Sequence, residues 1–392
     1  MSKKSKQELL AHYTGRYFMA DTKEKQRLLD EFVGITGYHR KYAIAALNHP
    51  RKPRLSPARR PRGKKYGPDV QAALVKLWMA ANRICAKRLV PFIPELMQAM
   101  QRHGELEVTP EVQAKLLTIS VATSDRLLQA ARRHRHWLKN GTTRPGTLLK
   151  HQIPIRTFAD WQDSRAGFAE VDLVAHCGRT TSGEYLNSLV LTDIATGWTE
   201  PVAVLNRSQA TVGAAIRLAR KRLPFDLLGL DSDNGSEFIN HHLLNYCQQH
   251  QITFTRCRAN KKNDQCFVEQ KNYTVVRQVV GYDRLEGPEA CQALAALYRP
   301  LRLYVNFFQP SLKLATKKRD GGHVTKTYER AKTPCQRVMD ATDIPQDIKE
   351  RLKADYESLN PVALLGQIQF FQDQLWEHTR VSILAEATPT PK

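Results

Sequence analysis

The hydrophobic and polar positions change their rhythm near residue 166, which divides the chain into a helical first part and a second part with strands. Before that point, apolar residues recur at the helical spacing of three and four in "KQRLLDEFVGIT" and "VQAALVKLWMAAN". After it, "GFAEVDLVAH", "EYLNSLVLTDI" and "WTEPVAVLN" predict three consecutive strands. With 392 residues, of which 42% are hydrophobic, the chain can form several packed domains.

Residues 25 to 48 predict two short helices separated by a break at Gly37, with His39, Arg40 and Lys41 at the start of the second helix. A tight turn with glycine between two short helices is typical of a helix-turn-helix, whose second helix enters the major groove of DNA by its N-terminal residues. A plain helical hairpin has the same pattern, so this alternative stays open.

Four further helical runs lie between residues 69 and 135 and predict a second helical DNA-binding unit. Ser120 is a candidate N-cap for the last of these helices. Arg126, Arg132 and Arg133 make the end of that helix basic, which favours contacts with phosphates.

The three predicted strands are followed by an alternation of helices and strands. The helix "QATVGAAIRLARKR" precedes a strand "FDLLGL", a helix "HHLLNYCQQH", a strand "ITFTRC" and a long helix from about Asp264. Three antiparallel strands and then alternating helices and strands is the order of a ribonuclease-H-like (RNase H-like) mixed sheet. The segment after residue 286 contains a basic, extended stretch, and the last fifty residues predict helices that form either a small domain or a contact between protomers.

These elements together predict a multidomain α and α/β protein with N-terminal helix-turn-helix units, an RNase H-like catalytic core and a helical C-terminal region. The predicted segments are a helix-turn-helix domain (1–50), a basic linker (51–66), a second helical domain (67–140), a linker (141–160), the RNase H-like core (161–285), an extension with a basic segment (286–340) and a helical C-terminal region (341–392).

The charge of the chain is concentrated in its first part. The net charge is +22, and residues 1–150 hold 30 basic and 11 acidic side chains, so this part alone carries +19. An excess this uneven favours a nucleic acid as the partner. The first linker has eight basic and no acidic side chains, which suits contacts with phosphates: Arg51, Lys52, Arg54, Arg59, Arg60, Arg62, Lys64 and Lys65.

The seven cysteines form no close CxxC pair, which argues against a structural zinc site or a disulfide framework and favours a reducing compartment. No stretch approaches the ~18 uninterrupted apolar residues of a membrane span. The N-terminus also lacks the apolar segment of a signal peptide. We therefore expect a cytoplasmic protein, associated with the nucleoid when it binds DNA.

One carboxylate lies inside the first predicted strand. Asp172 is flanked by Val171 and Leu173. An ionised side chain in an apolar strand is unfavourable unless it is paired or bound to a metal ion. Asp172 is therefore a candidate ligand for a divalent cation.

Other acidic side chains stand where predicted strands and helices begin or end. Asp231 and Asp233 follow the fourth strand, and their spacing of two does not choose between them. Glu269 lies in the opening turns of the long helix, where a solvated glutamate is the common alternative. Asp193 precedes a turn and predicts an ordinary side-chain contact to that turn.

The spacing of three of these residues carries a resemblance to a known family. Sixty residues separate Asp172 from Asp233, and thirty-five separate Asp233 from Glu269. Together with "DNGSEF" at 233–238, this resembles the D,D-35-E signature of the retroviral-integrase superfamily, which includes bacterial insertion-sequence transposases. Stretches such as "TGYHRKYAIAALN", "KNDQCFVEQKNYTVVRQVVGYDR" and "LYVNFFQPSLKLATKKRDGG" resemble one bacterial branch of these transposases.

The resemblance selects Asp233 over Asp231 and implies a DNA transposase. In that family Asp172, Asp233 and Glu269 would be the catalytic residues and would hold two Mg²⁺ or Mn²⁺ ions. The implied partners are double-stranded DNA, namely the terminal inverted repeats of the element and the target, and further copies of the chain in a dimer or tetramer. The implied reactions are DNA strand cleavage and strand transfer.

The chain also departs from the retroviral pattern. Retroviral integrases place lysines along the face of the glutamate helix where this chain has Tyr273 and Val276, so Arg277 is the candidate to replace one DNA contact. The preceding Lys261, Lys262 and Asn263 are candidates to bind phosphates. Two alternatives to a transposase stay open: a non-catalytic DNA-binding protein descended from one, and an RNase H-like structure-selective nuclease.

Overall fold

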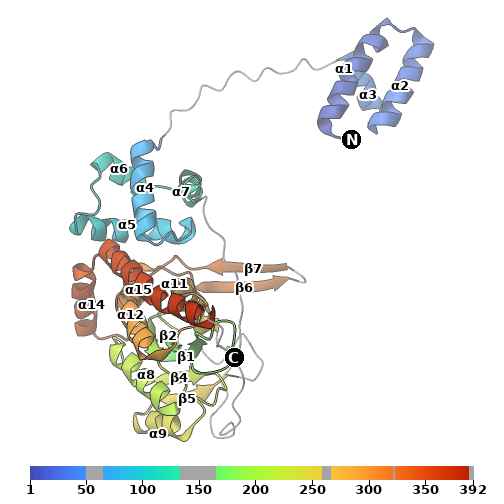
Figure 1. Ribbon diagram of the computed structural model, residues 1–392. Coiled ribbons are helices and arrows are strands. Elements are labelled where there is room, and N and C mark those ends of the chain that lie inside the picture. The colour runs from blue at the N-terminus through green and yellow to red at the C-terminus, as the bar shows by residue number, and fades with distance from the viewer. Residues whose placement is uncertain (50–64, 133–164, 258–265, 321–322, 388–392) are drawn as a thin grey trace. The chain divides into compact units, whose positions relative to one another are not determined.

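The structure is a computed structural model that describes residues 1–49, 65–132, 165–257, 266–320 and 323–387 (Figure 1). The chain divides into two compact units, residues 1–65 and residues 66–392. Most of the two predicted linkers, and the residues just before the predicted glutamate helix, lie outside the described residues.

The described part of the first unit contains three helices, which are α1 (Lys3–Met19), α2 (Thr22–Thr36) and α3 (Arg40–Asn48). The predicted break between the second and third helices is confirmed, because α2 ends at Gly37 with a φ of 63°, a left-handed conformation that glycine adopts without strain. Phe32 is fully buried among the three helices. The additional helix α1 was not predicted from the sequence, because its apolar residues lack a clear helical face.

The second unit begins with four helices that the sequence predicted. They are α4 (Pro68–Ala80), α5 (Ala86–Arg102), α6 (Pro110–Leu117) and α7 (Val121–Leu128). The hydroxyl of Ser120 accepts a hydrogen bond from the amide of Thr123 at 3.3 Å, which confirms the predicted N-cap of α7. The phenol of Tyr304 donates to the carbonyl of Ala80 at 2.8 Å, so these helices pack in the same unit as the sheet.

A five-stranded mixed sheet forms the centre of the second unit, in the order β3-β2-β1-β4-β5. The pairs β1–β2 and β2–β3 are antiparallel, whereas β1–β4 and β4–β5 are parallel, which confirms the predicted RNase H-like order. The strands are β1 (Phe168–Ala175), β2 (Asn187–Asp193), β3 (Thr199–Val204), β4 (Gly229–Ser232) and β5 (Thr253–Arg256). Strand β4 begins and ends later than the sequence predicted, so Asp231 lies inside it and Asp233 directly follows it.

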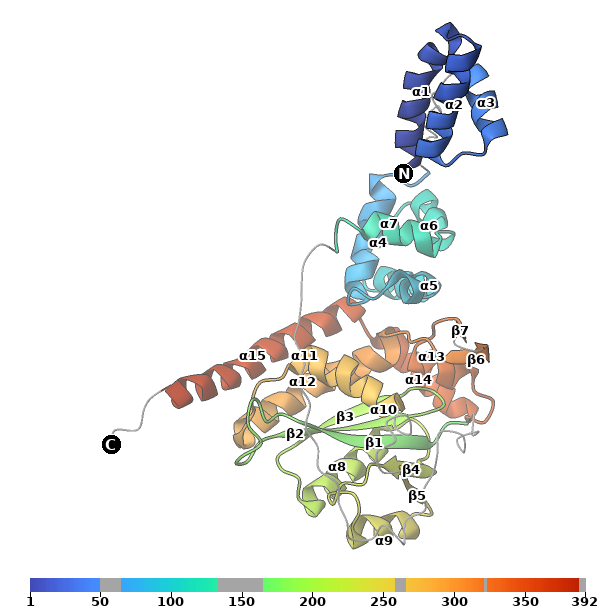
Figure 2. The ribbon, with the colours of Figure 1, turned by 90° about the vertical axis from the view of Figure 1, so that its right-hand side faces the viewer.

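Helices cover both faces of this sheet, as Figure 2 shows. One face carries α8 (Gln209–Arg222) and α9 (His241–Gln249), and the other carries α10 (Cys266–Lys271) and α12 (Gly287–Phe308). The predicted single helix from Asp264 is instead α10, a π-helical segment η1 (Asn272–Arg277) and the short α11 (Gln278–Val280). The wider turns of a π-helix let the adjacent Val275 and Val276 both lie in the core.

The chain ends in a hairpin and three helices. The hairpin is β6 (Leu314–Asp320) and β7 (His323–Tyr328), and the helices are α13 (Pro334–Asp340), α14 (Gln346–Ser358) and α15 (Pro361–Ala387). Helix α15 packs along α12, which confirms the predicted helical C-terminal region. None of the helices in the described residues is both long and apolar enough to cross a membrane.

Candidate active site

Asp172 lies in the second half of β1 and is held by the strand and by the helix above it. Its Oδ1 accepts a hydrogen bond from the amide of Leu173 at 2.8 Å, and its Oδ2 accepts one from the side-chain amide of Asn272 at 2.7 Å. The side chain is partly buried on the face of the sheet that α10 and η1 cover. These two hydrogen bonds define the orientation of its carboxylate.

Asp233 occupies the turn that follows β4. Its Oδ1 accepts a hydrogen bond from the amide of Gly235 at 2.8 Å. The side-chain amide of Asn234 donates to the carbonyl of Cys257 at 2.9 Å, which ties this turn to the end of β5. A methyl group at position 235 would lie 2.9 Å from Oδ1 of Asp233 and 2.7 Å from the carboxylate of Glu237, so any side chain here would displace these two carboxylates.

The third predicted carboxylate, Glu269, is exposed on α10 and interacts electrostatically with Asp172. Burial raises the pKa of Asp172 to about 7, and the negative charges of Asp233 and Glu269 add to this effect. Burial also raises the pKa of Asp233, where the charge of Glu237 adds to the shift and Arg207 opposes it. The structure thus brings the predicted carboxylates close enough for their charges to interact.

The donor chemistry of this cluster fits a divalent cation. Its acidic groups offer carboxylate oxygens, the ligands that Mg²⁺ and Mn²⁺ prefer. A cation between Asp172 and Asp233 would remove the repulsion that raises the pKa of Asp172. In the part of the chain that the structure describes, no three carboxylate, imidazole or thiolate groups already converge on one metal position.

Sequence reasoning missed a buried carboxyl group beside the cluster. Glu170 is 1% exposed, and its Oε2 accepts a hydrogen bond from the amide of Val268 at 2.8 Å. Burial raises the pKa of Glu170 to about 8, the hydrogen bond from Val268 opposes this shift, and the charge of Asp231 adds to it. The signal in the sequence was the spacing of two from Asp172, which places both side chains on one face of β1.

Asp231 lies in the strand rather than at its tip. It stands opposite Glu170 in the parallel register of β1 and β4, and its Oδ1 accepts a hydrogen bond from the hydroxyl of Thr255 at 2.6 Å. It therefore belongs to a polar row next to the predicted triad. The predicted turn contact of Asp193 is confirmed, since its Oδ1 accepts from the amide of Thr196 at 2.7 Å.

Comparison with known proteins identifies a domain family and a relative of the chain. Residues 163–262 match the integrase core domain family, a range that includes Asp172 and Asp233 and ends before Glu269. The uncharacterized protein y4rM of Sinorhizobium fredii is 46% identical over 339 residues, which are 86% of this chain and 96% of that protein. The chain belongs to the y4rM family and carries an integrase core.

Two solved structures illustrate what the integrase core is similar to. The catalytic core domain of BIV integrase is 19% identical with a TM-score of 0.30, and the match covers 44% of this chain and 93% of that one. The HTLV-2 integrase catalytic core domain in complex with magnesium, in its dimeric form, is 13% identical with a TM-score of 0.29, covering 37% and 90% of the two chains.

The helical segment after the family match places its predicted residues on different sides. Asn272 faces Asp172, Tyr273 is exposed, and Val276 is fully buried. Arg277, a predicted DNA contact, is half-buried and donates to the carbonyl of Ala175 at 2.9 Å, so it fastens the helix to the end of β1. The α-helical spacing used for the sequence prediction does not apply here, because η1 is π-helical.

Some of the other predicted DNA contacts lie within the described residues, and the rest lie outside them. His39 and Lys41 are exposed at the start of α3, and Arg40 there forms an ion pair with Asp30. Lys65 and Arg126 are exposed, and Arg132 forms an ion pair with Asp125 at 2.7 Å. The remaining predicted contacts lie outside the described residues: Arg51, Lys52, Arg54, Arg59, Arg60, Arg62, Lys64, Arg133, Lys261, Lys262 and Asn263.

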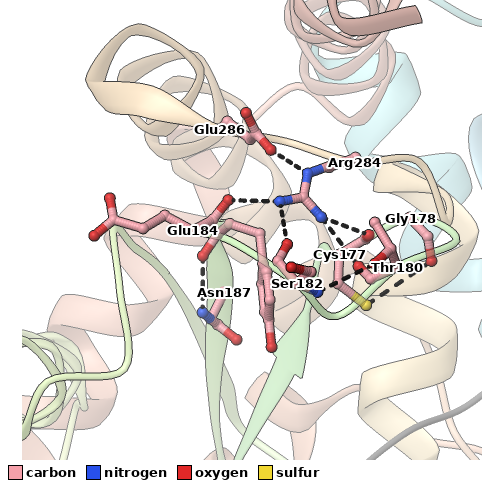
Figure 3. Close-up of polar contacts among 9 residues, drawn as sticks. Cys177, Gly178, Thr180, Ser182, Glu184, Asn187, Arg284 and Glu286 are labelled. Atoms are coloured by element: carbon pink, nitrogen blue, oxygen red, sulfur yellow. Dashed lines mark hydrogen bonds and ion pairs between the residues drawn. The ribbon is translucent and has the colours of Figure 1, made fainter. Parts of the chain in front are cut away.

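The loop between β1 and β2 of the integrase core is held by a single arginine, which sequence reasoning did not single out (Figure 3). This residue is Arg284, whose guanidinium forms an ion pair with Glu286. It donates to four backbone carbonyls of the loop, those of Cys177 (3.2 Å), Thr180 (3.0 Å), Ser182 (2.8 Å) and Glu184 (3.0 Å). The loop that leaves the strand of Asp172 is thereby fixed at several points along its length.

Proposed function

We propose that this protein is a DNA transposase that cleaves the ends of its element and joins them to target DNA. The observation that carries the proposal is that Asp172 on β1 and Asp233 after β4 lie on neighbouring parallel strands of an integrase core, and that Asn272, three residues after Glu269, hydrogen-bonds Asp172. Three acidic groups near one another repel, and this repulsion destabilises the fold. A function that uses their charge explains why they are present. Phosphoryl transfer between DNA strands uses such a cluster.

In the proposed reaction Asp172, Asp233 and Glu269 would hold two Mg²⁺ or Mn²⁺ ions. Such ions stabilise the negative charge that develops on the phosphate and make water or a 3′-hydroxyl a better nucleophile at neutral pH. The side chain of Asn272 keeps the carboxylate of Asp172 in one orientation, and the amide of Gly235 does the same for Asp233. An in-line displacement of this kind needs no covalent protein intermediate.

DNA recognition is proposed for the basic first part of the chain. Helix α3 presents His39 and Lys41 to solvent at its N-terminus, which is the end that a helix-turn-helix inserts into the major groove. We assign to this unit the recognition of the terminal inverted repeats. Two element ends must meet for transposition, so the active assembly is proposed to be a dimer or a tetramer of this chain, acting in the cytoplasm on the nucleoid.

A cleavage assay tests the proposal. Purified protein, Mg²⁺ and a labelled DNA fragment with one end of the element should give nicked and joined products. Asp233→Asn should reduce both products at least about a hundredfold, since it removes the charge of a metal ligand, while DNA binding stays near that of the wild type. The matched control is Asp226→Asn, the same change at an exposed aspartate before β4.

The outcomes separate the alternatives. Full activity of Asp233→Asn would refute the assignment of the triad. Specific binding by the wild-type protein without any cleavage would favour a non-catalytic DNA-binding protein. Cleavage without joining, on branched DNA and without preference for the element end, would favour a structure-selective nuclease.

A further inference from the structure

A buried glutamate of the sheet is bonded to the backbone of the helix that carries Glu269. Glu170 lies in β1, and its carboxylate accepts a hydrogen bond from the amide of Val268, at Oε2 and 2.8 Å, and another from the amide of Phe267. Both amides belong to the first turn of α10, which begins at Cys266. Amides in the first turn of a helix have no carbonyl acceptor within the helix, so an acceptor from elsewhere holds this turn in place.

The side chain of Glu170 is itself held in place. It stands opposite Asp231 in the parallel register of β1 and β4, and Asp231 stands opposite Thr255 of β5. The hydroxyl of Thr255 donates to Oδ1 of Asp231 at 2.6 Å. These three polar residues form a buried row across the sheet, one pleat before Asp172 and under the start of α10.

A second buried glutamate of the same sheet shows what a purely structural role looks like. Glu200 of β3 is also fully buried, but its carboxylate forms an ion pair with Arg302 at 2.5 Å and accepts from the indole of Trp198 at 2.8 Å. It bonds to side chains that pack the core. The hydrogen bonds that Glu170 accepts come instead from the backbone next to Glu269.

We propose that Glu170 is a positioning residue for the metal-dependent reaction: it fixes the first turn of α10 and so sets where Glu269 stands relative to Asp172 and Asp233. This inference rests on the proposed function of the three carboxylates. Val268 is buried and adjacent to the exposed Glu269, so a shift of the Val268 amide moves the backbone from which Glu269 reaches the site. Loss of the hydrogen bond would enlarge the range of positions of Glu269 and weaken metal binding.

Hydrogen exchange of the full-length protein, without metal or DNA, tests the geometric part. The amides of Phe267 and Val268 should exchange slowly in the wild type, although first-turn amides are otherwise unprotected. Glu170→Met, which keeps the volume and removes the acceptor, should speed their exchange by about tenfold or more. Glu170→Gln keeps a carbonyl oxygen as an acceptor and should stay close to the wild type.

The dependence of DNA nicking on metal concentration tests the functional part. Glu170→Met should raise the Mg²⁺ concentration for half-maximal nicking by about tenfold. The same concentration for Glu170→Gln should stay close to that of the wild type. DNA binding measured without metal should be the same for all three proteins. Glu200→Gln serves as the control, because it disturbs an equally buried glutamate that has no bond to α10 and should leave the metal requirement unchanged.

Each outcome decides one claim. Fast exchange of both amides in the wild type would overturn the proposal even if Glu170→Met failed to fold. An unchanged metal requirement in a folded Glu170→Met protein would also overturn it. If instead Asp233→Asn kept its activity, the proposed function would fail, and the exchange result would still stand as a description of how α10 begins.

Discussion

Asn272 and Asp172 are joined by a hydrogen bond of 2.7 Å, and this bond connects the helix of Glu269 with the central strand. The bond occupies Oδ2 of Asp172, while the amide of Leu173 occupies Oδ1. Both donors act on the ionised carboxylate and oppose the rise of its pKa. Asn272 therefore fixes the orientation of the Asp172 carboxylate, which in the proposed function binds a cation.

The first prediction concerns the substitution Asn272→Ala. Removal of one hydrogen bond to a carboxylate frees its orientation, so we expect nicking of an element end to slow by about tenfold, with DNA binding unchanged. Thr274→Ala is the control, since it also removes a side-chain hydrogen bond of this helix but at an exposed position. Equal rates for the wild type and Asn272→Ala would contradict the role given to Asn272.

The second prediction concerns metal binding and pH. The pKa of Asp172 is about 7, so this carboxylate is mostly protonated at pH 6 and mostly ionised at pH 8. Because a cation must displace the proton, we expect Mg²⁺ to raise the Tm of the protein more at pH 8 than at pH 6, by about 3 °C or more. Calorimetry at both pH values, with Asp233→Asn as the comparison, checks this. A Tm shift that is independent of pH, or that Asp233→Asn retains, would contradict it.

At the scale of elements, the loop between β1 and β2 depends on one side chain that lies far along the chain. Arg284 bonds four carbonyls of this loop and forms an ion pair with Glu286 (Figure 3). The next residue, Leu285, donates its amide to the carbonyl of His176 at 3.1 Å. The segment before α12 thus continues the sheet at the end of the strand that carries Asp172.

The third prediction concerns Arg284. Arg284→Ala leaves four loop carbonyls without this donor, of which that of Cys177 is partly buried and the other three are exposed, so we expect the free energy of unfolding of the second unit to fall by about 1–2 kcal/mol. Arg284→Lys should recover only part of this loss, because an ammonium group cannot span four carbonyls as a guanidinium does. Urea denaturation followed by circular dichroism measures the difference. Arg179→Ala, at an exposed position of the same loop, should change the stability by less than about 0.5 kcal/mol.

The elements also show how far sequence reasoning reaches. Ser120 and Gly37 were predicted correctly as helix ends, because capping and left-handed turns depend on neighbouring residues alone. The π-helical turns after Glu269 were not predicted, since the packing of Val275 and Val276 against the sheet decides them. Glu170 was missed for a similar reason: its partner amide lies almost a hundred residues later in the chain.

The candidate triad itself came from spacing and resemblance rather than from periodicity. Asp231 and Asp233 could not be separated by the strand pattern, because the end of β4 depends on its pairing with β1 and β5. The structure places Asp231 in the buried row with Glu170 and Asp233 in the turn beyond. The catalytic use of Asp233 remains our proposal.

At the scale of the whole molecule, most of the net charge and the candidate catalytic residues lie in different parts of the chain. Residues 1–150 hold almost all of the net charge of +22, whereas the integrase core match begins at residue 163. Electrostatic attraction to DNA is therefore proposed to come from a part of the chain that does not hold the candidate triad. The binding of DNA and its cleavage should respond to separate substitutions.

The fourth prediction tests this separation. Lys41→Ala removes an exposed cation at the start of α3, so we expect weaker binding to the element end and a slope of log affinity against log salt that is smaller by about one. The rate of nicking at saturating protein should not change. Lys23→Ala, at an exposed position near the start of α2, is the matched control. An unchanged salt slope for Lys41→Ala would contradict the assignment of α3 to DNA binding.

The crowded turn around Gly235 has a consequence for how this protein can be altered. A single added carbon there would press against the ends of two acidic side chains, which can swing aside at little cost to the folded state. Gly235→Ala should therefore yield a protein that melts almost as the wild type does and still has every acidic group, but with Asp233 pushed out of line. One methyl group at this position would separate the ability to fold from the ability to react.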